Sequence, residues 1–159
     1  MFAKPQAEHA WLESFIGNWS IETECQMGPD QPSHKSSGQA TCRSLEGMWL
    51  LIESTGTTPE SEAWSMLMTV GYDPAQSSYV GTFVGSMMTH LWTYQGSLDQ
   101  TGKKLILNTE GPQFSGEGMA RYQDSLELIN QDHWILSSQM QTETGEWNQF
   151  MTSHHRRIT

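Results

Sequence analysis

The sequence predicts an all-β fold, in which about ten short antiparallel strands form a barrel or sandwich behind one N-terminal helix. Two observations favour this class. Apolar and polar side chains alternate over many short segments, which is the period of a half-buried strand. Groups of Gly, Pro, Asn and Asp separate most of these segments, and no helical pattern lies between them. Because closure removes the exposed edges of such a long meander, we expect a barrel.

The one helical pattern lies near the N-terminus, at residues 5–15. Ala10, Trp11 and Phe15 fall near one face at helical spacing. Gly17 follows at the position where a glycine often ends a helix. We expect this short helix to close one end of the barrel.

Strand-like segments follow the helix without interruption. Trp19 and Ile21 alternate with Ser20 and Glu22, so the first strand has one buried face and one solvated face. The expected strands are residues 19–25, 38–45, 48–55, 64–72, 79–86, 88–96, 103–110, 118–122, 125–129, 134–141 and 147–156.

Composition restricts the partners and the compartment. The net charge of −10 disfavours nucleic acid and anionic membranes. No apolar run is long enough for a transmembrane helix or a secretory signal, so we expect a cytoplasmic protein with one domain over residues 1–159. Seven Trp and ten Met suggest a lined cavity, although core filling is the simpler explanation for any one of them.

Several motifs resemble a known bacterial family. Gly17-Asn18-Trp19 is similar to the Gly-x-Trp that opens the first strand in the lipocalin and fatty-acid-binding group, the calycins. More specific motifs are Val70-Gly71-Tyr72-Asp73-Pro74, Tyr79-Val80-Gly81-Thr82-Phe83-Val84, Ser86-Met87-Met88-Thr89 and Gly96-Ser97-Leu98-Asp99. Over residues 9–157 the chain resembles the domain of unknown function 1579 family. The resemblance implies an up-and-down lipocalin-like β-barrel of about ten strands and leaves its activity open.

The same resemblance implies a structural role for three residues. In lipocalin-like barrels an arginine near the end of the last strand packs over the Gly-x-Trp indole. The matching position here is Arg156 or Arg157, and we expect Arg156. Gly17, Trp19 and Arg156 would then close the barrel bottom through a cation–π contact.

Aromatic and sulfur-containing side chains in the middle strands are candidates for ligand binding. His90, Trp92 and Tyr94 would share one face of a strand. Facing inward they would line a cavity, and facing outward they would form an interface patch. The candidate ligand-binding residues are Trp64, Tyr72, Phe83, Met87, His90, Trp92 and Tyr94.

The histidines do not predict a metal site from their spacing. His154 and His155 are adjacent and would point to opposite faces of a strand. Nitrobindin-like barrels resemble this architecture and hold haem through a histidine on a late strand, so haem is an alternative. We assign no cofactor.

The cysteines and carboxylates do not by themselves predict a catalytic site. Cys25 and Cys42 flank the first hairpin loop and would face each other if the hairpin pairs without a bulge, although a cytoplasmic setting favours free thiols. Glu53 follows an apolar run, and a solvated position is the expectation for it. Asp124 is expected near a turn or on a solvated face.

The leading hypothesis is a barrel that holds a small, mostly apolar molecule in its interior, with no reaction assigned. One alternative is a haem protein or small enzyme that uses His90, His154 or Glu53. Another is a cavity-poor interaction module that forms a homodimer through its aromatic face.

Overall fold

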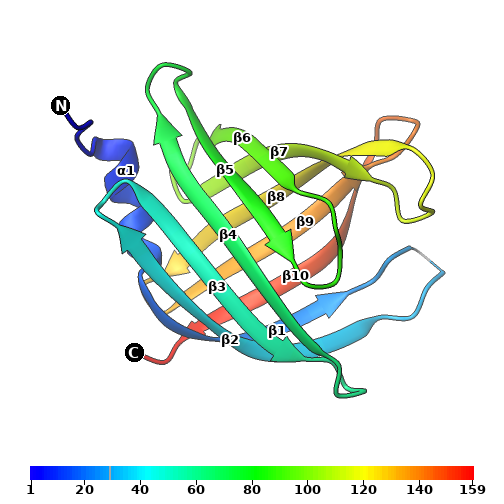
Figure 1. Ribbon diagram of the computed structural model, residues 1–159. Coiled ribbons are helices and arrows are strands. Elements are labelled where there is room, and N and C mark those ends of the chain that lie inside the picture. Colours follow the sequence, from blue (N-terminus) through cyan, green and yellow to red (C-terminus); the bar gives the residue numbers. More distant parts are fainter. Residues whose placement is uncertain (29) are drawn as a thin grey trace.

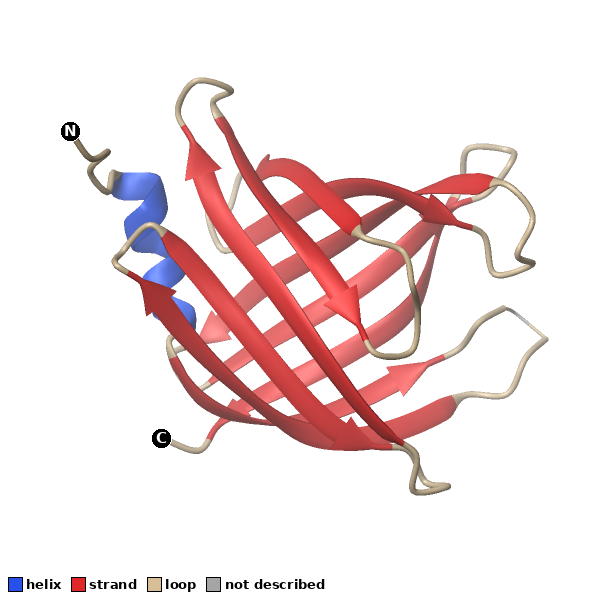
Figure 2. Ribbon diagram, viewed as in Figure 1, coloured by secondary structure: helices blue, strands red, loops and turns tan. Residues whose placement is uncertain are grey.

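Ten antiparallel strands form one closed barrel in the computed structural model, which describes residues 1–28 and 30–159 (Figure 1, Figure 2). Each strand pairs with its neighbours in sequence, and β10 pairs with β1 to close the ring. This confirms the up-and-down all-β barrel expected from the sequence. The strands are β1 (Gly17–Cys25), β2 (His34–Leu45), β3 (Trp49–Thr57), β4 (Ala63–Asp73), β5 (Ser78–Gly85), β6 (Trp92–Leu98), β7 (Lys104–Pro112), β8 (Met119–Asn130), β9 (His133–Gln141) and β10 (Trp147–Arg157).

The short helix α1 (Ala7–Leu12) lies across one end of the barrel, and a 3₁₀ turn (Glu13–Phe15) links it to β1 (Figure 1). Two long-range hydrogen bonds fix this segment: the Tyr79 hydroxyl donates to the carbonyl of Glu8 at 2.9 Å, and Trp11 Nε1 donates to the carbonyl of Gly102 at 2.8 Å. Within the described chain, no helix has the length and apolar character needed to cross a membrane.

The two ends of the barrel differ because the strands alternate in direction. We call the end that carries α1 and the β2–β3, β4–β5, β6–β7 and β8–β9 turns the helix end. The far end carries the longer β1–β2, β3–β4, β5–β6, β7–β8 and β9–β10 loops. Figure 2 shows these loops gathered opposite the helix.

Alternating side chains build the core. In β1, Trp19 and Ile21 are buried while Ser20 and Glu22 are exposed, as the two-residue period requires. The side chains with almost no exposure gather mainly toward the helix end. The largest of them are Trp19, Trp134, Phe15, Leu50, Leu105, Leu107, Leu126 and Val70.

Two of the expected strand assignments were wrong. Residues 118–122 and 125–129 belong to the single strand β8, because Gln123 and Asp124 continue its pairing with both β7 and β9. Residues 88–91 are not part of β6, which begins at Trp92; they belong to the β5–β6 loop.

Candidate functional site

Aromatic side chains fill the helix end of the barrel. Phe15, Trp19 and Trp134 are fully buried, and the Trp134 ring meets Phe15 and Trp19 edge to face at centroid distances of 5.0 and 6.2 Å. Trp19 Nε1 donates a hydrogen bond to the carbonyl of Phe15 at 2.9 Å. The void between α1 and the neighbouring β2–β3 turn has a volume of about 10 Å³, roughly enough for one water molecule. The interlocked rings of Phe15, Trp19 and Trp134 fill the interior at this end.

Arg157, and not Arg156, covers the Trp19 indole. The Arg157 guanidinium carbon lies 4.2 Å from the indole centroid, and the side chain donates hydrogen bonds to the carbonyls of Ile16 and Gln131 at 3.0 and 2.8 Å. The expectation of Arg156 was wrong, because β10 pairs with β1 so that Arg157 is opposite Trp19. Arg156 is exposed.

Several inward-facing side chains in the far half of the barrel remain partly accessible to solvent. Toward the helix end most inner side chains cover one another and are almost fully buried, with Tyr72, Leu98 and Leu128 as exceptions. Partial accessibility on the inner face therefore indicates space between the walls. The residues concerned are Thr23, Met66, Phe83, Asp124, Met140 and Met151.

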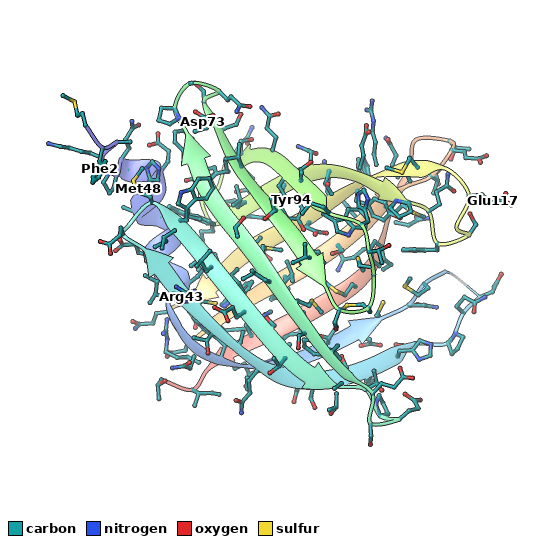
Figure 3. All side chains as sticks on the ribbon, in the orientation of Figure 1. Phe2, Arg43, Met48, Asp73, Tyr94 and Glu117 are labelled. Carbon is teal, nitrogen blue, oxygen red and sulfur yellow. The ribbon has the colours of Figure 1, made fainter. Side chains whose placement is uncertain are left out.

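A hydrogen-bonded set of three polar side chains, which we call the interior polar set, lies on the wall of this half: Tyr94, Asp124 and Ser138. The hydroxyl of Tyr94, labelled in Figure 3, donates to Asp124 Oδ2. The Ser138 hydroxyl donates to Asp124 Oδ1 at 2.6 Å. Burial raises the pKa of Asp124 above its ordinary value, and the two hydrogen bonds offset part of that rise. Burial and the neighbouring Asp124 also raise the pKa of Tyr94.

The interior position of Asp124 corrects the sequence analysis, which placed it on a solvated face or near a turn. The error came from dividing β8 at this residue. In one continuous strand every second residue points to the same face, so the inner face of β8 carries Tyr122, Asp124 and Leu126. The alternation Tyr122-x-Asp124-x-Leu126 was the signal that would have located it.

Two further polar atoms in this half have no hydrogen-bond partner among the described residues. They are Thr109 Oγ1 and Trp64 Nε1, each on a side chain that is 8 % exposed. Thr109 pairs with Tyr122, and Leu107 pairs with Asp124, so Thr109 is the diagonal neighbour of Asp124 on the same face. Buried polar groups are almost always paired in native proteins, and a third atom of this kind, Trp134 Nε1, lies in the packed helix end. Thr109 Oγ1 and Trp64 Nε1 differ from it in lying beside the partly accessible inner residues of the far half.

Four of the candidate ligand-binding residues project into the far half: Trp64, Phe83, Trp92 and Tyr94. Glycines on the neighbouring strands make room for the two indoles. An added Cβ at Gly111 would overlap the Trp92 ring, and one at Gly56 would overlap the Trp64 ring. The flat indoles thus lie against the wall.

The other three candidates lie elsewhere, so the seven residues do not form one wall. Tyr72 is at the helix end, where its ring contacts Tyr79 and His9 at centroid distances of 5.1 and 5.9 Å. Met87 lies in the β5–β6 loop and is 52 % exposed. His90 lies in the same loop, and not on a strand face as expected. Its ring meets Trp92 edge to face at 4.8 Å, and its Nε2 is 3.1 Å from the carbonyl oxygen of Glu110.

Sequence reasoning also missed an aromatic cluster at the far end. Trp92 contacts Tyr122 at a centroid distance of 4.9 Å, and Phe114 contacts Phe150 at 4.9 Å and Tyr122 at 6.1 Å. A bulge after Gln149 in β10 lies beside Phe150. Four elements far apart in sequence therefore contribute to one apolar rim.

The late histidines lie on opposite sides of the wall. His155 is inward, 2 % exposed, and stacked on Trp134 at 3.7 Å, and burial lowers its pKa to about 3. Its Nδ1 donates to the carbonyl of Ser153 at 3.2 Å. His154 is hydrogen-bonded to His133 at 2.9 Å. Over residues 1–28 and 30–159, no three His, Cys, Asp or Glu side chains gather as a metal site would require.

The remaining reactive residues are not part of the interior site. Cys25 pairs with His34 and Cys42 with Gly17, so the two cysteines do not lie opposite each other, and both thiols are free. The reason is that β1 and β2 are joined in a register that separates the two cysteines by most of the length of β1. Glu53 is solvated, as expected, and forms an exposed ion pair with Arg43 at 3.2 Å.

A groove of about 690 Å³ lies toward the far end, between β1, β2, β10 and the β3–β4 loop, and its lining includes the inward-facing Thr23 as well as outer-face residues. Its lining is polar and includes Glu22, Glu24, Lys35 and His154. Because this groove lacks aromatic and aliphatic walls, it does not offer the apolar lining that small-molecule pockets usually have.

Comparison with protein families agrees with this architecture. Residues 4–157 match the family described as a protein of unknown function, DUF1579. The chain belongs to this family. No curated protein sequence matches it significantly.

Solved structures with low sequence identity share the fold of this DUF1579 protein. The crystal structure of Rv2717c from M. tuberculosis is similar at a TM-score of 0.64 and 10 % identity, covering 98 % of this chain and 100 % of that one. The S-type phycobiliprotein lyase CPES from Guillardia theta gives a TM-score of 0.60 at 12 % identity, with 98 % and 99 % covered. The barrel EF1p2_mFAP2b bound to DFHBI gives 0.51 at 10 % identity, with 95 % and 99 % covered.

Proposed function

We propose that this protein binds a small, mostly apolar molecule in the far half of the barrel. The observation that carries the proposal is the contrast between the two halves. Most inner side chains toward the helix end are closely packed and almost fully buried, whereas several of those in the far half, among them Met66, Phe83 and Asp124, remain partly accessible. An apolar cavity with a few convergent polar groups is the usual build of a small-molecule site.

The ligand contacts Trp64, Phe83, Trp92 and Tyr94 on the inner wall. Their rings supply apolar area, and the interior polar set and Thr109 supply hydrogen bonds that orient the molecule. Met87 and His90 lie in the loop beside the mouth, where they meet a ligand on entry. The similar fold of the barrel EF1p2_mFAP2b, whose structure is bound to DFHBI, supports this proposal.

Filling the cavity from the wall tests this proposal. Met66 points inward, and its neighbour Leu67 points outward and is 36 % exposed. Met66→Trp should weaken binding of the neutral fluorescent probe N-phenyl-1-naphthylamine at least about tenfold, whereas Leu67→Trp should leave it within about twofold of wild type. The measurement is a fluorescence titration, with circular dichroism melts to verify that both variants fold.

Two results would contradict the proposal. One is a wild-type protein that does not bind the probe after extraction of any bound molecule. The other is a folded Met66→Trp variant with unchanged affinity. Native mass spectrometry of the purified protein reports any co-purified ligand and the number of subunits in the same measurement.

A further inference from the structure

Asp124 provides hydrogen-bond acceptors to the barrel interior. Its two carboxylate oxygens each receive one hydroxyl, from Tyr94 and from Ser138. An ionised carboxylate offers about four lone-pair positions, so about two remain for other donors. The residue is partly accessible, and a molecule bound in the far half of the barrel would meet it on the inner wall.

Among the described residues, no basic side chain forms an ion pair with this carboxylate. The ion pairs in the described part of the chain are Arg43–Glu53, Arg121–Glu110 and Arg157–Asp132. Arg157 faces inward but lies at the helix end, where it covers Trp19 and is bonded to two backbone carbonyls. His155 also faces inward, but it is stacked on Trp134 and stays neutral near neutral pH, because burial lowers its pKa to about 3.

The Thr109 hydroxyl is a second, independent feature of the same wall. It is buried, has no partner among the described residues, and lies diagonal to Asp124 across the β7–β8 pair. A hydroxyl both donates and accepts, so it can accept from the group that donates to Asp124 or donate to that group's oxygen. An unpaired buried hydroxyl destabilises the empty protein, and a ligand that pairs with it removes this cost.

We propose that the ligand is bound through a hydrogen-bond donor, a hydroxyl or an ammonium group on an apolar body, which Asp124 accepts, and that the site rejects carboxylates. This inference rests on the proposed function. An anionic head group would enter a cavity whose one charged acceptor has the same sign, with no arginine or lysine beside it. A hydroxyl or ammonium head group instead satisfies Asp124, and Thr109 can pair with it as well.

Three ligands with the same chain and different head groups test the proposal: decanol, decylamine and decanoate. Each competes with N-phenyl-1-naphthylamine for the wild-type protein at about pH 8, below the concentration at which the ligand forms micelles. Decanol and decylamine should displace the probe at concentrations at least about tenfold lower than decanoate. Asp124→Asn keeps the size of the side chain and should reduce this preference to within about threefold.

Glu22→Gln is the matched control, because it also removes one negative charge but from the exposed outer face of β1. It should leave the wild-type preference unchanged. Thr109→Val removes the hydroxyl at constant shape, and should weaken decanol binding about threefold or more while decanoate is unaffected. This variant also decides the question if Asp124→Asn does not fold.

The outcomes separate the two proposals. Binding of the probe together with equal displacement by decanoate and decanol overturns the head-group inference and leaves the ligand-binding barrel intact. The same conclusion follows if folded Asp124→Asn and Thr109→Val keep the wild-type order. If neither the probe nor any of the three ligands binds, the proposed function itself fails.

Discussion

Single inward-facing side chains have opposite roles at the two ends of this barrel. Arg157 is held by an indole face, two backbone carbonyls and an ion pair with Asp132, so it acts as structural packing. Asp124 has two hydroxyl donors and no cationic partner among the described residues, so it keeps the capacity to accept more hydrogen bonds.

The roles of the two C-terminal arginines can be separated by stability. Arg157→Ala should lower the free energy of unfolding by about 2 to 3 kcal/mol, because it removes the cation–π contact and two charge-assisted hydrogen bonds. Arg156→Ala, at an exposed position, should change it by less than about 0.5 kcal/mol. Urea unfolding followed by tryptophan fluorescence measures both, and equal effects would contradict the assignment of Arg157.

At the scale of elements, glycines decide where the large rings of neighbouring strands can lie. The Trp92 indole of β6 occupies the space over Gly111 of β7. On the outer face, the Trp49 ring of β3 covers Gly71 of β4 in the same way. The pairing of a large ring with a glycine on the next strand lets the ring lie flat against the barrel wall.

Gly111→Ala should displace the Trp92 indole, because the added Cβ overlaps the ring. We expect a loss of about 1 to 3 kcal/mol in unfolding free energy and weaker probe binding. Gly28→Ala is the control, since its Cβ would meet only Gln31 Cγ at 3.4 Å.

A double variant with Trp92→Leu tests the same contact directly. If the overlap is the cause, Gly111→Ala should cost at least about 0.5 kcal/mol less in that background than in wild type. Additive effects of the two substitutions would show that Gly111 acts through its backbone and not through the indole.

Among the ionisable groups that the barrel encloses, His155 and Asp124 have pKa values that burial shifts against their charged forms, in opposite directions. Burial lowers the pKa of His155 to about 3, so the folded chain binds fewer protons at this residue than the unfolded chain. Its contribution to stability is complete above the unfolded pKa of about 6.5 and is lost as the pH falls toward 3. Burial raises the pKa of Asp124, so its contribution is complete below about 3.8 and is lost as the pH rises through its folded pKa.

Replacing each group should therefore change the pH profile of stability in opposite directions. Between about pH 7.5 and pH 5.5, wild type should lose about 1.4 kcal/mol relative to His155→Phe, because the unfolded histidine takes up a proton that the folded one does not. Over the acidic range, wild type should gain stability relative to Asp124→Asn as the pH falls. Urea titrations across this range provide the measurement, and parallel profiles for wild type and His155→Phe would contradict a buried neutral imidazole.

The sequence by itself determined the fold class and the N-terminal helix. The reason is that apolar residues recur every two positions in a strand with one buried face, and about every 3.6 positions in a helix with one buried face. Both periods can be recognised in the sequence alone. Trp19 and Ile21 against Ser20 and Glu22 are sufficient to place β1 with its inner face, and the turn residues mark most strand ends. The family resemblance rests on similar local motifs, and the match over residues 4–157 agrees with it.

Only the tertiary structure decided which residues meet inside the barrel. Adjacent residues of a strand point to opposite faces, so an error of one position in the strand assignment places a side chain on the wrong face of the barrel wall. Pairing of Trp19 with Arg157 selected Arg157 over Arg156, and continuous pairing of β8 brought Asp124 inside to Tyr94 and Ser138. These contacts join residues that are 14 to 138 positions apart in the sequence. Strand pairing around the closed barrel brings them together, and this pairing cannot be predicted from local sequence patterns.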